Sequence, residues 1–275
     1  MSVLFDVPGP RARQRHRLGG AVSLVALVGL IGFGVWKLYE KGQFAGALWE
    51  PFVTPVYMLA ILEGIVRTLQ IAVVAVLLSL VFGAVFGIGR ISEHAFLRWP
   101  CAILVEFFRA VPLLMLILAI FLVYGTEIGT FWSLVIGLTL YNGSVLAEVF
   151  RAGILAVPTG QGEAGYSIGM RKNQVLRLVL LPQAVRIMLP AIISQCVVAL
   201  KDTSLGYVIG ASDLLDVLER VSQEFDSIIP SALMAAALYI AINASLSRVA
   251  QWLEGRSRRP GDQAGQVNVK EQGAG

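Results

Sequence analysis

Charged residues are scarce in this 275-residue chain, and the residue types that build metal sites and disulfides are rarer still. Only 15% of the residues are charged, whereas 56% are hydrophobic and the mean hydropathy is +0.74. Soluble globular domains carry about 25% charged residues, so this composition excludes an ordinary soluble domain. The two histidines, His16 and His94, lie far apart, and Cys101 and Cys196 both fall inside apolar runs. We therefore expect no metal site and no disulfide framework, only buried free thiols.

The apolar residues gather in long runs separated by short polar segments. The runs cover approximately residues 20–39, 57–89, 100–124, 131–154, 184–209 and 228–253. A helix needs about twenty apolar residues to cross a bilayer, and lipid offers no partners for unpaired backbone groups. The sequence therefore predicts an all-α polytopic membrane protein with about six transmembrane helices. The net charge of +4 does not indicate nucleic-acid binding, because the positive residues sit beside the apolar runs.

The N-terminus has some features of a signal peptide. Arginines at positions 11, 13, 15 and 17 precede the first apolar run. That run is longer than the 7–15 residues of a signal h-region, and no A-x-A-like cleavage site follows it. We interpret residues 1–19 as a basic N-terminal segment and residues 20–39 as a retained transmembrane helix.

The distribution of lysine and arginine predicts the orientation. Positive side chains recur on alternate polar segments, at Arg90 and Arg98, at Arg171, Lys172 and Arg177, and at Arg256, Arg258 and Arg259. The segment before the last run instead carries Asp213, Asp216, Glu219, Glu224 and Asp226 against Arg220 alone. Because cytoplasmic loops are enriched in positive charge, we expect this acidic segment outside and both termini in the cytoplasm. After Arg259 the chain is rich in Gly, Gln and Ala, and residues 254–275 are predicted to be a disordered cytoplasmic tail.

A polar segment with several glycines interrupts the apolar runs at residues 155–183. Thr159 is predicted to cap a short helix that reaches Ile168, and Gly169 suits a left-handed position after it. Asn173 is predicted to cap a second helix, which Pro182 would limit. The spacing alone fits two interpretations: an amphipathic loop packed on the protein's own helices, or a helix–turn–helix to which a partner binds.

The residues of this segment fit the pattern E-A-[AG]-x3-G-x9-[IV]-x-L-P. The specified positions are Glu163, Ala164, Gly165, Gly169, Val179, Leu181 and Pro182. The pattern resembles the EAA loop of type I ABC importer permeases. The sequences YNGSVLAEVFRAGILAVPTGQGEAGYSIGM, LPQAVRIMLPAIISQCVVALKDTSL and EFFRAVPLL, together with residues 64–69, are similar to the polar amino acid branch of that family. The resemblance covers most of the chain after residue 57, and residues 20–39 lie outside it.

The resemblance implies a MetI-like permease core over residues 57–253 in a bacterial inner membrane. It implies that Glu163, Ala164, Gly165, Gly169, Leu181 and Pro182 contact an ABC ATPase, so we name residues 155–183 the coupling segment. The ATPase is expected to be a separate protein, because the chain lacks a G-x-x-x-x-G-K-[ST] element. A second permease chain, identical or different, and an extracytoplasmic binding protein complete the expected importer. The implied substrate is a polar amino acid, with glutamate or glutamine preferred, and no cofactor or catalysis is expected.

Charged residues inside the apolar runs are candidates for the substrate pathway, because charge is costly in lipid. Glu106 with Arg109, and Glu148 with Arg151, are spaced three apart, so each pair shares a helical face. Pro112 follows the first pair and is expected to bend or loosen the helix there. Adjacent helical residues point about 100° apart, so Lys201 and Asp202 cannot pair with each other and need partners on other helices, water or a ligand. The resemblance places the segment KDTSL along the translocation route. The candidate pathway residues are Arg109, Glu148, Lys201, Asp202, Thr203 and Ser204, with Glu148 and Asp202 for a substrate ammonium and Lys201 or Arg109 for carboxylates. Mutual neutralisation that stabilises the fold is the alternative for the two pairs.

Two other functions fit an apolar chain with buried charges. A stand-alone secondary transporter would use the intramembrane carboxylates to relay protons, and it predicts inverted repeats. A membrane-embedded enzyme or anchor would need a nucleophile–base pair or a metal cluster, and the sequence offers neither. Transport by the isolated protein in liposomes would separate a secondary transporter from an importer that depends on an ATPase.

Overall fold

The computed structural model describes residues 9–257, which are mostly helical and contain no strand. The predicted all-α class is confirmed. The long helices are α1 (Pro10–Glu40), α2 (Pro55–Arg90), α3 (Ala95–Ala110), α4 (Leu113–Leu155), α7 (Leu181–Asp202) and α9 (Ile228–Ser257). The short ones are η1 (Gly46–Leu48), η2 (Glu50–Val53), α5 (Thr159–Ser167), α6 (Lys172–Gln174), η3 (Val175–Leu180), η4 (Thr203–Ile209) and α8 (Leu214–Phe225). Of the predicted tail, residues 254–257 continue α9, and the remainder lies outside the described residues.

Five of the described helical segments are long and apolar enough to cross a membrane, one fewer than the number of runs in the sequence. The difference lies in α4, whose 43 residues would form a straight helix about 65 Å long, roughly twice the thickness of a bilayer core. Gly129, with φ 74° and ψ 172°, changes the chain direction inside it. The two arms of α4 therefore account for parts of two apolar runs.

The run at 100–124 is not one helix, because the chain breaks between α3 and α4. Val111 has extended backbone angles (φ −79°, ψ 129°), and Pro112 precedes the first residue of α4. A residue before proline avoids the helical region, and proline itself has no N–H to donate. The sequence prediction that Pro112 would bend or loosen this helix is confirmed.

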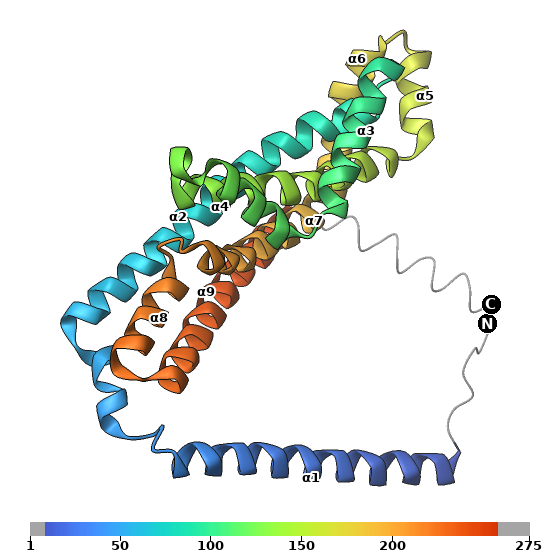
Figure 1. Ribbon diagram of the computed structural model, residues 1–275. Helices are drawn as coiled ribbons and strands as arrows, with labels where there is room; N and C mark the ends of the chain where they lie inside the picture. The colour runs from blue at the N-terminus through green and yellow to red at the C-terminus, as the bar shows by residue number, and fades with distance from the viewer. Residues whose placement is uncertain (1–8, 258–275) are drawn as a thin grey trace.

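The largest helix–helix contact joins α2 to α4, and small residues of α2 bring the two backbones close together. A Cβ atom on Gly83 would lie 2.7 Å from the Cβ of Leu146, and one on Gly87 would lie 2.7 Å from the carbonyl oxygen of Ala147. Close approach through small residues is how helices gain packing contacts in a membrane. Figure 1 shows α2, α7 and α9 running through the same bundle.

A buried carboxylate fixes the start of α8 against this bundle. Asp213 is fully buried, and one of its carboxylate oxygens accepts a hydrogen bond from the Asp216 N–H at 2.9 Å. The Leu214 N–H donates to the Thr68 hydroxyl of α2 at 3.0 Å. Burial raises the pKa of Asp213 to about 6, against the opposing effect of backbone N–H donors at the helix start. The other carboxylate oxygen is buried without a hydrogen-bond partner in the described residues.

Helix α1 stands apart from this bundle in Figure 1. Its most apolar stretch, within residues 14–40, buries none of its residues against the rest of the chain. The helix begins at Pro10, so it includes part of the segment predicted as a basic N-terminus. A 31-residue helix is long enough to span a bilayer core of about 30 Å.

Candidate functional site

The coupling segment begins with helix α5 and a left-handed turn. Gly169 has φ +80°, its N–H donates to the Tyr166 carbonyl at 2.9 Å, and the Met170 N–H donates to the Gly165 carbonyl at 3.1 Å. The predicted left-handed glycine is confirmed. The predicted Thr159 cap is wrong, because Pro158 precedes the helix and Thr159 is its first residue. Proline's fixed φ already directs the chain into the helix without a side-chain cap.

The second half of the coupling segment differs from the prediction in two ways. Asn173 lies inside α6 and does not cap it; the Arg171 N–H instead donates to the Gln174 side chain at 2.8 Å. The helix also does not end at Pro182. A π-helical stretch, η3, runs directly into α7, and Pro182 occupies the first turn of α7. A proline is tolerated there because the first turn of a helix has N–H groups without intrahelical partners.

Two contacts hold the turn of the coupling segment together. Gly165 is buried against Val175, and a Cβ at this glycine would lie 2.9 Å from a Val175 methyl group. Lys172 forms an ion pair with Glu93 in the connection between α2 and α3. The hydrogen bond and the positive charge of Lys172 lower the pKa of the Glu93 carboxyl. The turn is thus packed internally and linked to a second polar connection of the chain.

The outer side of the coupling segment is open. Glu163, Ala164, Gly169 and Pro182 are exposed, and Leu181 is half-buried. Sequence reasoning missed two apolar side chains that share this surface: Tyr166 is 49% exposed and Ile168 is 79% exposed. The sequence did contain a signal for them, because both are apolar residues inside an otherwise polar, glycine-containing segment. A carboxylate beside exposed apolar groups is suited to contact with another protein.

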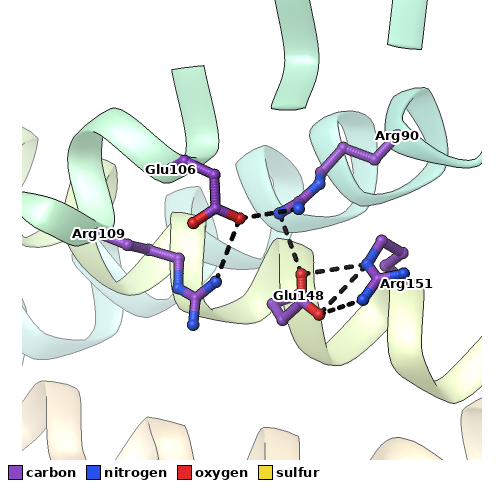
Figure 2. Close-up of polar contacts among 5 residues, drawn as sticks. All are labelled: Arg90, Glu106, Arg109, Glu148 and Arg151. Atoms are coloured by element: carbon purple, nitrogen blue, oxygen red, sulfur yellow. Dashed lines mark hydrogen bonds and ion pairs between the residues drawn. The ribbon is translucent and has the colours of Figure 1, made fainter. Parts of the chain in front are cut away.

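Five charged residues from three helices form an ionic cluster, shown in Figure 2. The members are Arg90 of α2, Glu106 and Arg109 of α3, and Glu148 and Arg151 of α4. Each predicted pair is confirmed: Arg109 lies 3.5 Å from Glu106, and Arg151 lies 2.5 Å from Glu148. Three guanidinium groups face two carboxylates, so the ionic cluster has one positive charge in excess.

Arg90 joins the two predicted pairs into one cluster. Its guanidinium lies 2.8 Å from Glu106 and 3.0 Å from Glu148, and its side chain is only 12% exposed. The sequence predicted only that Arg90 lies on the cytoplasmic side, not that it joins these charges. Its position at the end of an apolar run was a signal that it lies near the other buried charges. The planar guanidinium can donate to two carboxylates at once, which a lysine could not do in the same plane.

A second polar network connects α4 with α7. Gln195 donates to the Asn142 side-chain carbonyl at 2.5 Å, and Asn142 donates to the Asp202 carboxylate at 3.5 Å. We call these residues the amide network. The prediction that Asp202 needs a partner on another helix is confirmed. Asn142 and Gln195 were missed, because uncharged amides in apolar runs stand out less than charges do.

Lys201 and Ser204 lie beside this network and face a cavity. The cavity has a volume of about 570 Å³, and Tyr239 and Asn243 of α9 form part of its opposite wall. Lys201 is exposed and forms no ion pair within the described residues 9–257. Thr203 is buried, and its hydroxyl donates to the Leu200 carbonyl at 2.7 Å.

The candidate pathway residues therefore fall into two groups. Arg109 and Glu148 belong to the ionic cluster, whereas Lys201, Asp202, Thr203 and Ser204 lie at the end of α7 and the start of η4. Helix α4 connects the groups, because it carries both Asn142 and Glu148. These residues are separated by about 9 Å along the helix axis.

Residues 75–259 of the chain match the family described as "Binding-protein-dependent transport system inner membrane component". The chain belongs to this family. It is a permease subunit of a type I ABC importer, a multi-pass membrane protein that serves transport.

Individual permeases are similar over most of their length. The chain is 40% identical to the glutamate transport system permease protein GluD of Corynebacterium glutamicum, over 81% of this chain and 86% of that protein. It is 34% identical to the probable glutamine ABC transporter permease protein GlnP of Bacillus subtilis, over 70% and 92%.

Solved permease structures share the fold. A crystal structure of an amino acid ABC transporter with histidines superposes with a TM-score of 0.69 at 28% identity, covering 73% of this chain and 95% of that one. The methionine transporter MetNI in an inward-facing conformation gives a TM-score of 0.66 at 20% identity, which shows the fold alone. These relatives and neighbours are ABC transporter permeases, so they give no support to a stand-alone secondary transporter.

Proposed function

We propose that this permease is the translocating subunit of an importer for glutamate or glutamine. It works with a second permease chain, a separate ATPase and an extracytoplasmic binding protein. The observation that carries the substrate class is the 40% identity, over 81% of the chain, to a permease of a glutamate transport system. The 34% identity to a probable glutamine permease supports the same class of ligand.

The coupling segment is the proposed contact with the ATPase, through Glu163, Ala164, Gly165, Gly169, Leu181 and Pro182. Its open surface supports this role, because Glu163 and Ile168 are exposed while Gly165 is buried against Val175. In this proposal the coupling segment and both termini face the cytoplasm, and α8 faces outward. Conformational changes of the ATPase then reach α4 and α7, the helices on either side of the segment.

The end of α7 is the proposed place where the permease meets its substrate. An amino acid carries an ammonium and a carboxylate, and such groups bind best to side chains of opposite charge. Lys201 and Asp202 supply both charges, and Lys201 and Ser204 line the cavity of about 570 Å³. Glu148 and Arg109 already have partners in the ionic cluster, so a substrate would have to compete for them. We therefore place Lys201, Asp202, Thr203 and Ser204 nearest the substrate, with Arg109 and Glu148 further along the same route.

Transport by purified components tests the function as a whole. Vesicles containing the permease, its ATPase and its binding protein should accumulate labelled glutamate or glutamine only when ATP is present. Other amino acids added in excess should compete according to the substrate range. Accumulation driven by a proton gradient in vesicles with the permease alone would refute the proposal in favour of a secondary transporter.

Crosslinking tests the coupling segment and the orientation together. In a chain with Cys101 and Cys196 replaced by serine, Glu163→Cys should crosslink to the ATPase. Gln223→Cys, an exposed position on α8, is the matched control and should not. Crosslinks from Gln223→Cys alone would mean that the proposed orientation is inverted.

A further inference from the structure

A small cavity with a basic lining opens between α2, α3 and α4. It has a volume of about 200 Å³ and is lined by Arg90, Arg98, Trp99, Ala102 and Arg151. Arg90 is the last residue of α2, Arg98 and Trp99 lie in the first two turns of α3, and Arg151 lies near the end of α4. The cavity is therefore at the same end of the bundle as the coupling segment. In Figure 1, α3 appears at the same end as α5 and α6.

The charges around this cavity leave a positive excess. Arg90 and Arg151 belong to the ionic cluster, in which three arginines face two glutamates. Arg98 is exposed and adds a further positive charge, with no ion pair in the part of the chain that the structure describes. A guanidinium has five N–H donors, so Arg90 and Arg151 retain donors beyond those that bind glutamate. Such a lining fits a phosphate group, whose oxygens accept paired guanidinium donors.

An apolar stripe runs from the cavity along α3. Its members are Phe96 (92% exposed), Trp99 (61%), Ile103 (65%) and Phe107 (59%). Spacings of three and four residues place these side chains on one face of the helix. Trp99 belongs to both the cavity and the stripe, and tryptophan is enriched where a membrane meets water. A ligand that fills both features has an anionic head and a hydrocarbon chain.

We propose that the basic cavity and the apolar stripe of α3 bind one anionic phospholipid. The phosphodiester lies among Arg90, Arg98 and Arg151, and an acyl chain lies along Trp99, Ile103 and Phe107. The inference rests on the proposed orientation, which puts this end of the bundle at the cytoplasmic leaflet. Basic pockets between membrane helices on that side are suited to anionic headgroups. A free phosphate would leave the apolar stripe uncovered.

Bound lipid would affect the ionic cluster directly. Arg90 and Arg151 both contact Glu148, at 3.0 Å and 2.5 Å. A headgroup phosphate accepts from the guanidinium donors that the carboxylate leaves free, and it neutralises the excess positive charge. Bound lipid therefore changes the net charge of the ionic cluster next to the break between α3 and α4.

Quenching of Trp99 fluorescence by brominated lipid tests the site. The complete transporter is placed in phosphatidylcholine vesicles that contain either phosphatidylglycerol or phosphatidylcholine with brominated chains. The Trp99 signal is the difference between the unmodified chain and Trp99→Phe, because the chain has five tryptophans. We expect brominated phosphatidylglycerol to quench this signal several-fold more efficiently. Unbrominated phosphatidylglycerol should reverse the quenching, and millimolar inorganic phosphate should not.

Matched charge variants identify the cavity as the origin of the preference. Arg98→Gln should weaken the preference for phosphatidylglycerol about fivefold, as expected for one basic residue near an anionic surface. Arg186→Gln removes a charge from an exposed position in the first turns of α7 and should leave the preference intact. Equal losses in both variants would overturn the proposal, because they would indicate a general surface charge.

The remaining outcomes also decide the question. Equal quenching by the two brominated lipids would mean ordinary surrounding lipid, and no quenching by either would mean that another protein covers the stripe. Reversal by inorganic phosphate would mean a site for free anions. Each of these results refutes the lipid site. ATP-driven uptake measured in the same vesicles tests the proposed function separately, so one proposal can fail while the other holds.

Discussion

Replacing Gly169 by alanine should loosen the turn of the coupling segment without creating a steric clash. A Cβ at this position would have no atom within 4 Å, so the cost comes from the backbone alone. The residue has φ +80°, and an L-residue in the left-handed region costs roughly 1–2 kcal/mol. This free energy corresponds to about a 5- to 30-fold increase in the population of the opened turn.

The matched control is Gly160→Ala, which adds the same methyl group inside α5, the short helix that precedes the turn. Gly160 also has no atom within 4 Å of its would-be Cβ, but its φ is not positive. Alanine in a helix is favoured over glycine by about 1 kcal/mol at most. The control should therefore leave the turn unchanged or make it slightly more stable.

Amide hydrogen exchange in the complete transporter measures the difference. The N–H groups of Gly169 and Met170 close the turn onto Tyr166 and Gly165, so their exchange reports its opening. Exchange should be about 5- to 30-fold faster in Gly169→Ala than in the unmodified chain. ATP-driven uptake should fall in the same variant, because fewer molecules present an ordered surface to the ATPase.

An asparagine at position 169 should give an intermediate exchange rate, since asparagine tolerates left-handed angles better than alanine does. Equal exchange in Gly169→Ala and Gly160→Ala would refute the backbone argument. Faster exchange with undiminished uptake would instead refute the role of this turn in coupling.

Three further predictions follow from helix packing and charge. Gly87→Ala should destabilise the α2–α4 contact by about 1–3 kcal/mol. On heating, buried Cys101 should then react with a thiol dye at a lower temperature than in the unmodified chain. Gly29→Ala, whose added methyl group lies in open space, should leave that temperature unchanged. Arg90→Gln should lower the melting temperature, because Glu106 and Glu148 lose their shared partner. Replacing one of these two glutamates by glutamine in the same chain should restore part of the lost melting temperature. Burial raises the folded-state pKa of Asp213 to about 6, so its protonated form favours folding. That stability is complete below the unfolded-state pKa of about 3.9 and is lost as the pH rises through about 6. The melting temperature should therefore fall less between pH 4 and pH 7 in Asp213→Asn than in the unmodified chain.

Local features of this fold could be predicted because they depend on neighbouring residues. Apolar runs located the long helices, Pro112 marked the break between α3 and α4, and Gly169 marked the turn after α5. The pairs Glu106–Arg109 and Glu148–Arg151 followed from helical spacing. In each case the deciding interaction spans at most a few residues of the chain.

The capping predictions failed because several residues near each helix start can satisfy the same backbone groups. Thr159 was a reasonable cap, but Pro158 already directs the chain into the helix. Pro182 was expected to end a helix, yet it lies in the first turn of the next one, where its missing N–H costs little. Proline alone does not distinguish the end of one helix from the start of another.

The connections between helices lay beyond sequence reasoning for a different reason. Arg90 meets Glu148 across 58 positions of the chain, and Asn142 meets Asp202 across 60. Such contacts depend on the rotation and depth of two packed helices. A difference of one residue in a span boundary turns a side chain by about 100°. The apolar runs fix boundaries too coarsely to predict which faces meet.

If the coupling segment binds the ATPase as proposed, two sets of contacts link its movement to the membrane helices. The segment is the loop of a helical hairpin, with the second arm of α4 entering it and α7 leaving it. Close to the loop, Ile154 and Val157 pack against Ala184 and Met188, which holds the base of the hairpin together. About 20 Å further along α4, Asn142 links the arms again through Gln195 and Asp202. In the proposed mechanism, these two links make α4 and α7 move together when the loop is displaced. Because α4 also carries Glu148, the same displacement acts on the ionic cluster, and through it on α2 and α3. If a variant that breaks the Asn142–Gln195 contact still transports normally, the base packing alone transmits the movement.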